Sequence, residues 1–167
     1  MVHLWDSKSK GETELSKSAL GQNATGDIAV VIGSEKLDFD LVSLGCRMAK
    51  SAKRKVHLVH VIEVPRALPL KAVLEQESDR ANKLLGSALQ IAKAIGCEAV
   101  AEVVQARDAG SAIVEEAKDH QCALILIGAT RRINQGNDIG KTIPYILTHA
   151  PCRVWLVQDS PSSSNMP

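Results

Sequence analysis

The segment richest in chemically useful residues is the glycine-rich stretch at 128–142. Its glycines, Gly128, Gly136 and Gly140, lie among two arginines and a lysine. Glycines let backbone N–H groups approach an anion, and a helix expected to begin near Lys141 adds a favourable dipole at the same place. The stretch therefore suits phosphate binding. The alternative is a long exposed loop whose glycines serve only to make turns.

The end of this stretch is similar to a nucleotide-binding P-loop but departs from it. Residues 136–142 read GNDIGKT, one residue shorter than the GxxxxGK[ST] pattern, and they do not directly follow the preceding expected strand. Pro144 also interrupts the helix that should follow. A P-loop NTPase is therefore disfavoured.

We find no set of residues suited to general acid–base or nucleophilic catalysis. Ser34 follows Gly33, but the GxSxG pattern of a nucleophile elbow is absent. Asp108 and Asp138 could help to hold Mg²⁺ beside a phosphate, although helix capping and turn formation explain both. We therefore expect no catalytic residues.

The sequence also predicts no metal site. His57 and His60 are an odd number of positions apart on an expected strand, so they face opposite sides of the sheet. His120 and His149 lie at expected helix C-termini, where an imidazole complements the helix dipole. The cysteines lack CxxC spacing and are expected to be reduced and packed as small apolar groups; they are Cys46, Cys97, Cys122 and Cys152.

The elements that must position these residues alternate between apolar runs and helical periodicity. Uninterrupted apolar runs predict strands covered on both faces, and apolar residues at three- and four-residue steps predict amphipathic helices. This alternation predicts an α/β fold with right-handed crossovers, in which helices cover both faces of a five-stranded parallel doubly wound sheet in one domain. The expected strands are 28–32, 56–62, 98–104, 123–127 and 153–157, and the expected helices include 37–52, 81–95 and 141–149, with another that Asp108 caps.

Ligands of such sheets bind beyond the carboxyl ends of strands, where the strand order reverses. The candidate site thus combines the end of the first strand with the glycine-rich stretch. Its predicted residues are Ile32, Gly33, Ser34, Gly128, Arg131, Arg132, Gly140, Lys141 and Thr142.

Composition limits the function classes. The chain has 167 residues with 20 basic and 19 acidic side chains, so it lacks the basic excess of a nucleic-acid-binding protein. Its longest apolar run is too short to span a membrane, and we expect a cytoplasmic protein. Polar residues 1–26 are expected to form a flexible linker or tail, 27–157 the folded domain, and 158–167 a disordered tail.

Residues 27–157 resemble a universal stress protein domain. The family signature after the fourth strand, G-x-x-G-x(9)-G-[ST], matches at Gly128 and Thr142, with Arg131 and Lys141 at the other two positions. Ile32 stands where ATP-binding members carry Asp. The resemblance implies strand order 3-2-1-4-5, binding of ATP or another adenine nucleotide with Mg²⁺, and a homodimer formed through the last strand, here Arg153, Val154, Trp155, Leu156 and Val157.

A narrower likeness concerns residues 64–70 and 140–142. They are similar to universal stress domains at the cytosolic C-terminus of bacterial amino acid permeases, in which residues 2–26 would be the tether from the last membrane helix. We therefore expect a non-catalytic regulatory, stress-response domain that binds an adenine nucleotide or related anion. The alternative is a ligand-free dimerisation or interaction module that has lost ATP binding.

Overall fold

The fold is seen in a computed structural model, which describes residues 25–33, 36–129 and 140–158. Five parallel strands form one sheet in the order β3-β2-β1-β4-β5. The α/β class and the strand order implied by the family resemblance are thereby confirmed. The strands are β1 (Ile28–Val31), β2 (Val56–Glu63), β3 (Ala99–Ala106), β4 (Leu124–Ala129) and β5 (Arg153–Gln158), and the helices are α2 (Lys36–Ala52), α3 (Glu75–Ile95), α4 (Ala109–Asp119) and α5 (Thr142–His149).

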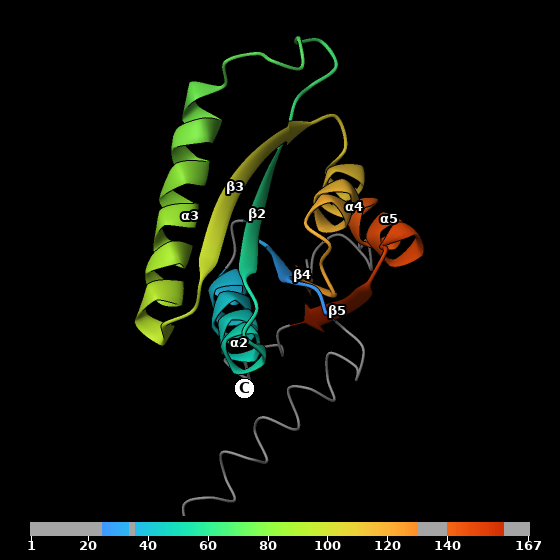
Figure 1. The fold of residues 1–167 in the computed structure, drawn as a ribbon. Helices are drawn as coiled ribbons and strands as arrows, with labels where there is room; N and C mark the ends of the chain where they lie inside the picture. Colours follow the sequence, from blue (N-terminus) through green and yellow to red (C-terminus); the bar gives the residue numbers. More distant parts are fainter. Residues whose placement is uncertain (1–24, 34–35, 130–139, 159–167) are drawn as a thin grey trace, which may run out of the picture.

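Helices cover both faces of the sheet (Figure 1). Helices α2 and α3 pack on one face, and α4 and α5 pack on the other. The central strand β1 contributes to both cores, since Ile28 and Val30 belong to the first and Ala29 to the second. Burial on both faces explains why its sequence is continuously apolar.

Helix α3 differs most from its predicted bounds. It begins at Glu75 rather than near Ala81 and ends, as expected, before Gly96, whose φ of 74° is left-handed. The first turn lacks apolar periodicity, so the sequence pattern missed it. Glu75 and Glu77 instead complement the positive end of the helix dipole.

The chain enters the sheet through a close contact at Gly26. A Cβ at this position would clash with the carbonyl oxygen of Gln121. The carbonyl of Asp27 accepts a 2.7 Å hydrogen bond from the backbone N–H of Ala123. The predicted linker therefore ends against the segment that leads into β4. The rest of that predicted linker, 1–24, and residues 159–167 of the predicted tail lie outside the described residues. In the described part of the chain, no helix is long and apolar enough to cross a bilayer.

Candidate functional site

The candidate site lies where the strand order reverses. Strand β1 has β2 on one side and β4 on the other, and Val30 pairs with Leu126. Gly33 and Gly128 therefore lie at the ends of adjacent parallel strands. This is the edge at which open α/β sheets bind ligands.

Ile32 contributes to this edge through its backbone. Its side chain is 2% exposed and packs in the core on the α2 and α3 side. Its carbonyl oxygen lies 2.8 Å from Nδ1 of His60, which must donate because a carbonyl only accepts. The backbone of Ile32 thus links the end of β1 to His60 of β2, while its side chain lies in the core.

Asp38 is an acidic group at this edge that the sequence analysis did not identify. The backbone N–H of Gly33 donates a 2.8 Å hydrogen bond to its Oδ2, and the residue is 6% exposed. The sequence could have indicated this role, because Asp38 lies in the first turn of α2, where an aspartate is well placed to accept backbone hydrogen bonds. Asp38 holds the turn that leaves β1.

Lys141 lies between two carboxylates. Its Nζ is 3.1 Å from Oδ2 of Asp108 and 3.4 Å from Oε1 of Glu63. The hydrogen bond to Asp108 and the negative charge of Glu63 raise the pKa of Lys141 above its ordinary value. Lys141, which the sequence predicts to bind phosphate, is therefore charged and already paired with two carboxylates. One of them, Glu63, is the last residue of β2.

Asp108 also caps α4, as its sequence predicts. Its Oδ1 accepts a 3.0 Å hydrogen bond from the backbone N–H of Ser111. That hydrogen bond, followed by the one from Lys141, holds the pKa of Asp108 below its ordinary value. Glu63 Oε1 accepts from the backbone N–H of Ala109 at 2.9 Å, so both carboxylates face the N-terminus of α4.

The remaining predicted site residues divide into two groups. Gly140 and Thr142 form the first group and lie within the described residues. Gly140 has a φ of 65°, and a Cβ there would meet no atom within 4 Å. Thr142 begins α5 directly after Lys141. Thr142 lies beside the start of α4, since its carbonyl oxygen would be 3.2 Å from a Cβ on Gly110. Ser34, Arg131 and Arg132 lie outside the described residues.

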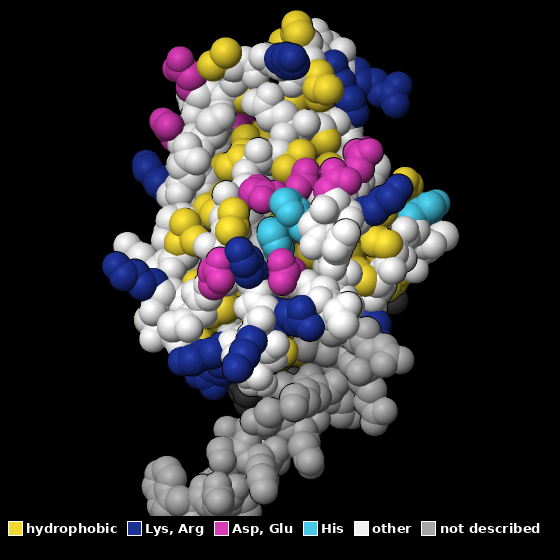
Figure 2. Space-filling view, in the orientation of Figure 1, with side chains coloured by type: hydrophobic (Ala, Val, Ile, Leu, Met, Phe, Trp, Pro, Cys, Tyr) yellow, Lys and Arg dark blue, Asp and Glu magenta, His cyan; other side chains and the backbone are white. Residues whose placement is uncertain are grey.

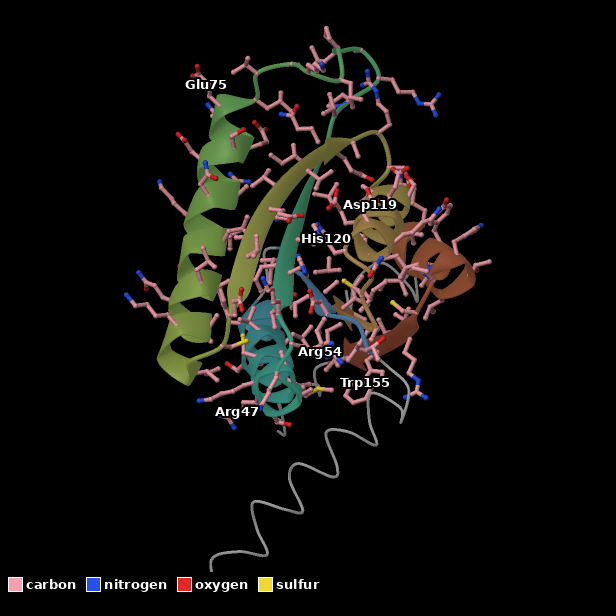
Figure 3. The ribbon with its side chains drawn as sticks, in the orientation of Figure 1. Arg47, Arg54, Glu75, Asp119, His120 and Trp155 are labelled. Carbon is pink, nitrogen blue, oxygen red and sulfur yellow. The ribbon has the colours of Figure 1, made fainter. Side chains whose placement is uncertain are left out.

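The predicted dimer strand β5 forms an edge of the described sheet. It pairs with β4, as at Trp155 with Leu126. Leu156 is 39% exposed, and Trp155, labelled in Figure 3, packs partly against the core. Among the described residues, the strand thus presents apolar surface at one edge of the sheet.

A second polar cluster lies away from this edge, on the sheet face that α4 and α5 partly cover. It brings together His57, Glu102 and His120, whose nitrogen and oxygen atoms lie within 4.8 Å of one another. Figure 2 shows histidine side chains near the middle of one face, flanked by acidic groups. Sequence spacing did not predict this cluster because its members come from β2, β3 and the end of α4.

Comparison with solved structures shows the same fold. A universal stress protein of Archaeoglobus fulgidus in complex with dAMP has a TM-score of 0.64 at 16% identity, covering 78% of this chain and 96% of that one. UspA of Lactobacillus plantarum has a TM-score of 0.64 at 21% identity, covering 79% and 97%. An Arabidopsis thaliana member with AMP bound has a TM-score of 0.57 at 15% identity, covering 84% and 96%.

No curated protein matches the sequence. The model of the universal stress protein family matches residues 25–158, which include every strand and helix in the described part of the chain. The chain therefore belongs to the universal stress protein family.

Proposed function

We propose that this domain is a non-catalytic regulatory module that binds an adenine nucleotide at the carboxyl edge of β1 and β4. The observation that carries the proposal is the placement of Gly33, just after β1, and Gly128, near the end of the adjacent β4, at the point where the strand order reverses. Related structures that contain dAMP and AMP support the choice of nucleotide.

The described residues suggest separate tasks at this edge. Gly33 is exposed, so a ligand can approach its backbone closely, and Gly140 provides the left-handed turn that leads into α5. Lys141 would offer its ammonium group to a phosphate, at the cost of its present contacts with Asp108 and Glu63. The same two carboxylates are oxygen ligands of the kind that Mg²⁺ prefers in a nucleotide complex.

Isothermal titration calorimetry with AMP, cyclic AMP and ATP, each with and without Mg²⁺, tests this proposal. We expect saturable binding to the wild-type chain and weaker binding to Lys141→Met. Lys118→Met is the matched control, because Lys118 is an exposed lysine in the last turn of α4. Absence of binding by wild type to all three nucleotides, under conditions in which circular dichroism shows it folded, would refute nucleotide binding.

Homodimerisation through β5 is the second part of the proposal. The position of β5 at an edge of the described sheet and the exposed Leu156 favour it, since an apolar edge strand is a natural site for pairing with another copy. If no nucleotide binds, this edge supports the alternative function, a ligand-free interaction module. Analytical ultracentrifugation distinguishes a dimer from a monomer.

We further propose that the domain works in the cytoplasm, on a membrane transporter. The likeness of residues 64–70 and 140–142 to the cytosolic domains of amino acid permeases supports this, and a response to stress would follow from the family. Genomic sequence on the N-terminal side of Val2 tests the link. Membrane-spanning helices in the same reading frame would support a permease, whereas a stop codon directly before Met1 would contradict it.

A further inference from the structure

The cluster of His57, Glu102 and His120 is built by three elements that are distant in sequence. His57 in β2 pairs with Val100 in β3, and Glu102 lies two residues farther along β3, so both side chains project from the same face of the sheet. His120 follows the last residue of α4 and brings its ring over His57, with centroids 4.0 Å apart. Figure 3 shows His120 between the end of α4 and the two strands.

The ring of His57 has one nitrogen paired and one without a partner. Nε2 lies 3.0 Å from Oδ2 of Asp27, so it carries the hydrogen that the carboxylate accepts. Nδ1 is buried and has no hydrogen-bond partner among the described residues, although the His57 side chain is only 8% exposed. Oε1 of Glu102 lies 3.9 Å from Nδ1, too far for a hydrogen bond.

An unpartnered nitrogen beside a carboxylate is suited to bind a cation. In the tautomer fixed by Asp27, Nδ1 holds a lone pair that faces the carboxylate of Glu102, and burial of an unsatisfied polar atom is unfavourable. A cation between the nitrogen and the carboxylate removes both costs. A proton on Nδ1 would supply the charge but would find no acceptor at hydrogen-bond distance.

More acidic groups surround the second ring. His120 Nε2 lies 2.9 Å from Oε2 of Glu102 and 3.3 Å from Oε2 of Glu116. The nitrogen is therefore flanked by one carboxylate from β3 and one from α4. Two imidazoles and two carboxylates are a donor set typical of zinc.

We propose that His57 Nδ1, the carboxylate of Glu102 and His120 Nε2 bind a divalent transition-metal ion, with Zn²⁺ as the best match, and that Glu116 is available as a fourth ligand. The stacked rings must adjust for their lone pairs to converge. The adjustment falls to His120, whose side chain is 29% exposed, whereas that of His57 is 8% exposed and held by Asp27.

Asp27 is a positioning residue in this site. A carboxylate that accepts the remaining N–H of a ligating histidine fixes its tautomer and increases its basicity as a ligand. Asp27 itself is held by the backbone N–H of Lys55, which donates to Oδ1 at 3.1 Å. Loss of such a partner typically weakens metal binding by about 10- to 100-fold.

Titration of the full chain, without an affinity tag, with Zn²⁺ tests the site. Calorimetry should give one ion bound per chain, and Zn²⁺ should raise the thermal midpoint. We expect binding at least about tenfold weaker in His57→Gln, His120→Gln and Glu102→Gln, and weaker also in Asp27→Asn. His149→Gln is the matched control, because His149 is an exposed histidine at the end of another helix, α5, and should bind as wild type does.

Co²⁺ identifies the ligands independently of affinity. A site of nitrogen and oxygen ligands gives visible d–d bands without the intense near-ultraviolet thiolate band that cysteine ligands would add. Nitrogen-15 spectra of histidine should place the metal on Nδ1 of His57, with Nε2 still protonated.

Three results would overturn the proposal. They are absence of saturable Zn²⁺ binding by folded wild type, unchanged binding in His120→Gln, and a thiolate band with Co²⁺. Because His57→Gln risks unfolding a buried position, His120→Gln decides the question if circular dichroism shows that His57→Gln is unfolded.

Discussion

The Nζ atom of Lys141 lies 3.1 Å from Oδ2 of Asp108, which joins the start of α5 to the start of α4. The contact couples the glycine-rich stretch to a helix cap on a different βα unit. A nucleotide phosphate near Lys141 would meet the charge of Asp108 at the same time. Asp108 is therefore expected to oppose phosphate binding when no Mg²⁺ is present.

The first prediction concerns that opposition. Asp108→Asn removes the negative charge, while asparagine remains a good N-cap for α4. We expect affinity for AMP without Mg²⁺ to rise several-fold in Asp108→Asn and to fall in Lys141→Met, as measured by calorimetry. If AMP affinity changed equally and in the same direction in Asp108→Asn and Lys141→Met, the two side chains would not act on the phosphate through their charges.

The second prediction concerns the cap itself and its pH dependence. Asp108→Ala should lower the free energy of unfolding by about 1 kcal/mol near neutral pH, because Ser111 loses its acceptor. The folded-state pKa of Asp108 lies below its ordinary value of 3.8, so its contribution is present above that value and is lost as the pH falls through the folded pKa. Urea unfolding curves of the two proteins should differ at pH 7 and converge in acid.

Asp79→Ala is the control for this cap, because Asp79 is exposed in α3. Its unfolding curve should follow that of wild type at both pH values. A constant difference between Asp108→Ala and wild type down to low pH would contradict the capping role.

The third prediction compares two helical glycines. A Cβ on Gly45 would lie 2.8 Å from Cγ2 of Val30 and 3.1 Å from Cδ1 of Leu126, because α2 packs closely on the sheet there. A Cβ on Gly86 of α3 would meet no atom within 4 Å. Gly45→Ala should therefore destabilise the domain by about 1–3 kcal/mol, and Gly86→Ala should stabilise it by about 0.5–1 kcal/mol. Chemical denaturation that gave both changes the same sign would contradict the packing of α2.

The fourth prediction concerns the buried thiols. Burial raises the pKa of Cys46 and of Cys122 to about 12, against 9.0 for a free thiol. Both should resist alkylation at pH 8 in the folded protein and react after unfolding, as read by mass spectrometry. Because the unfolded thiols ionise first, stability should be unaffected below about pH 8 and decrease above about pH 9. Rapid alkylation of either thiol in the folded chain would exclude its burial.

The fifth prediction tests the exposed edge of β5. Leu156→Lys places a charge on an edge strand, which blocks pairing with another chain. We expect the sedimentation coefficient to shift from dimer to monomer in this variant and to stay unchanged in Leu147→Lys, whose leucine is 55% exposed on α5. If wild type is already a monomer at high concentration, β5 is not a dimer interface.

Much of the fold follows from local pattern. Continuous apolar runs such as 28–31 and 124–127 identify strands buried on both faces, and Asp108 and Gly96 mark helix ends, because burial, capping and left-handed backbone are local demands. The observed bounds of an element differ from the predicted ones where interactions other than apolar burial determine its end. The start of α3 at Glu75, where charge rather than apolar periodicity favours the helix, is the clearest case.

The sequence by itself determined the α/β class and the alternation of elements, and it predicted the edge at which we propose the ligand site. Only the tertiary structure decided which charges meet, since Lys141 pairs with Glu63 and Asp108, and His57 meets Glu102 and His120. Sequence periodicity tells which face of a strand a side chain occupies. Contacts between elements depend on strand register and on where a helix ends over the sheet, and neither is encoded in the spacing of residues along one element.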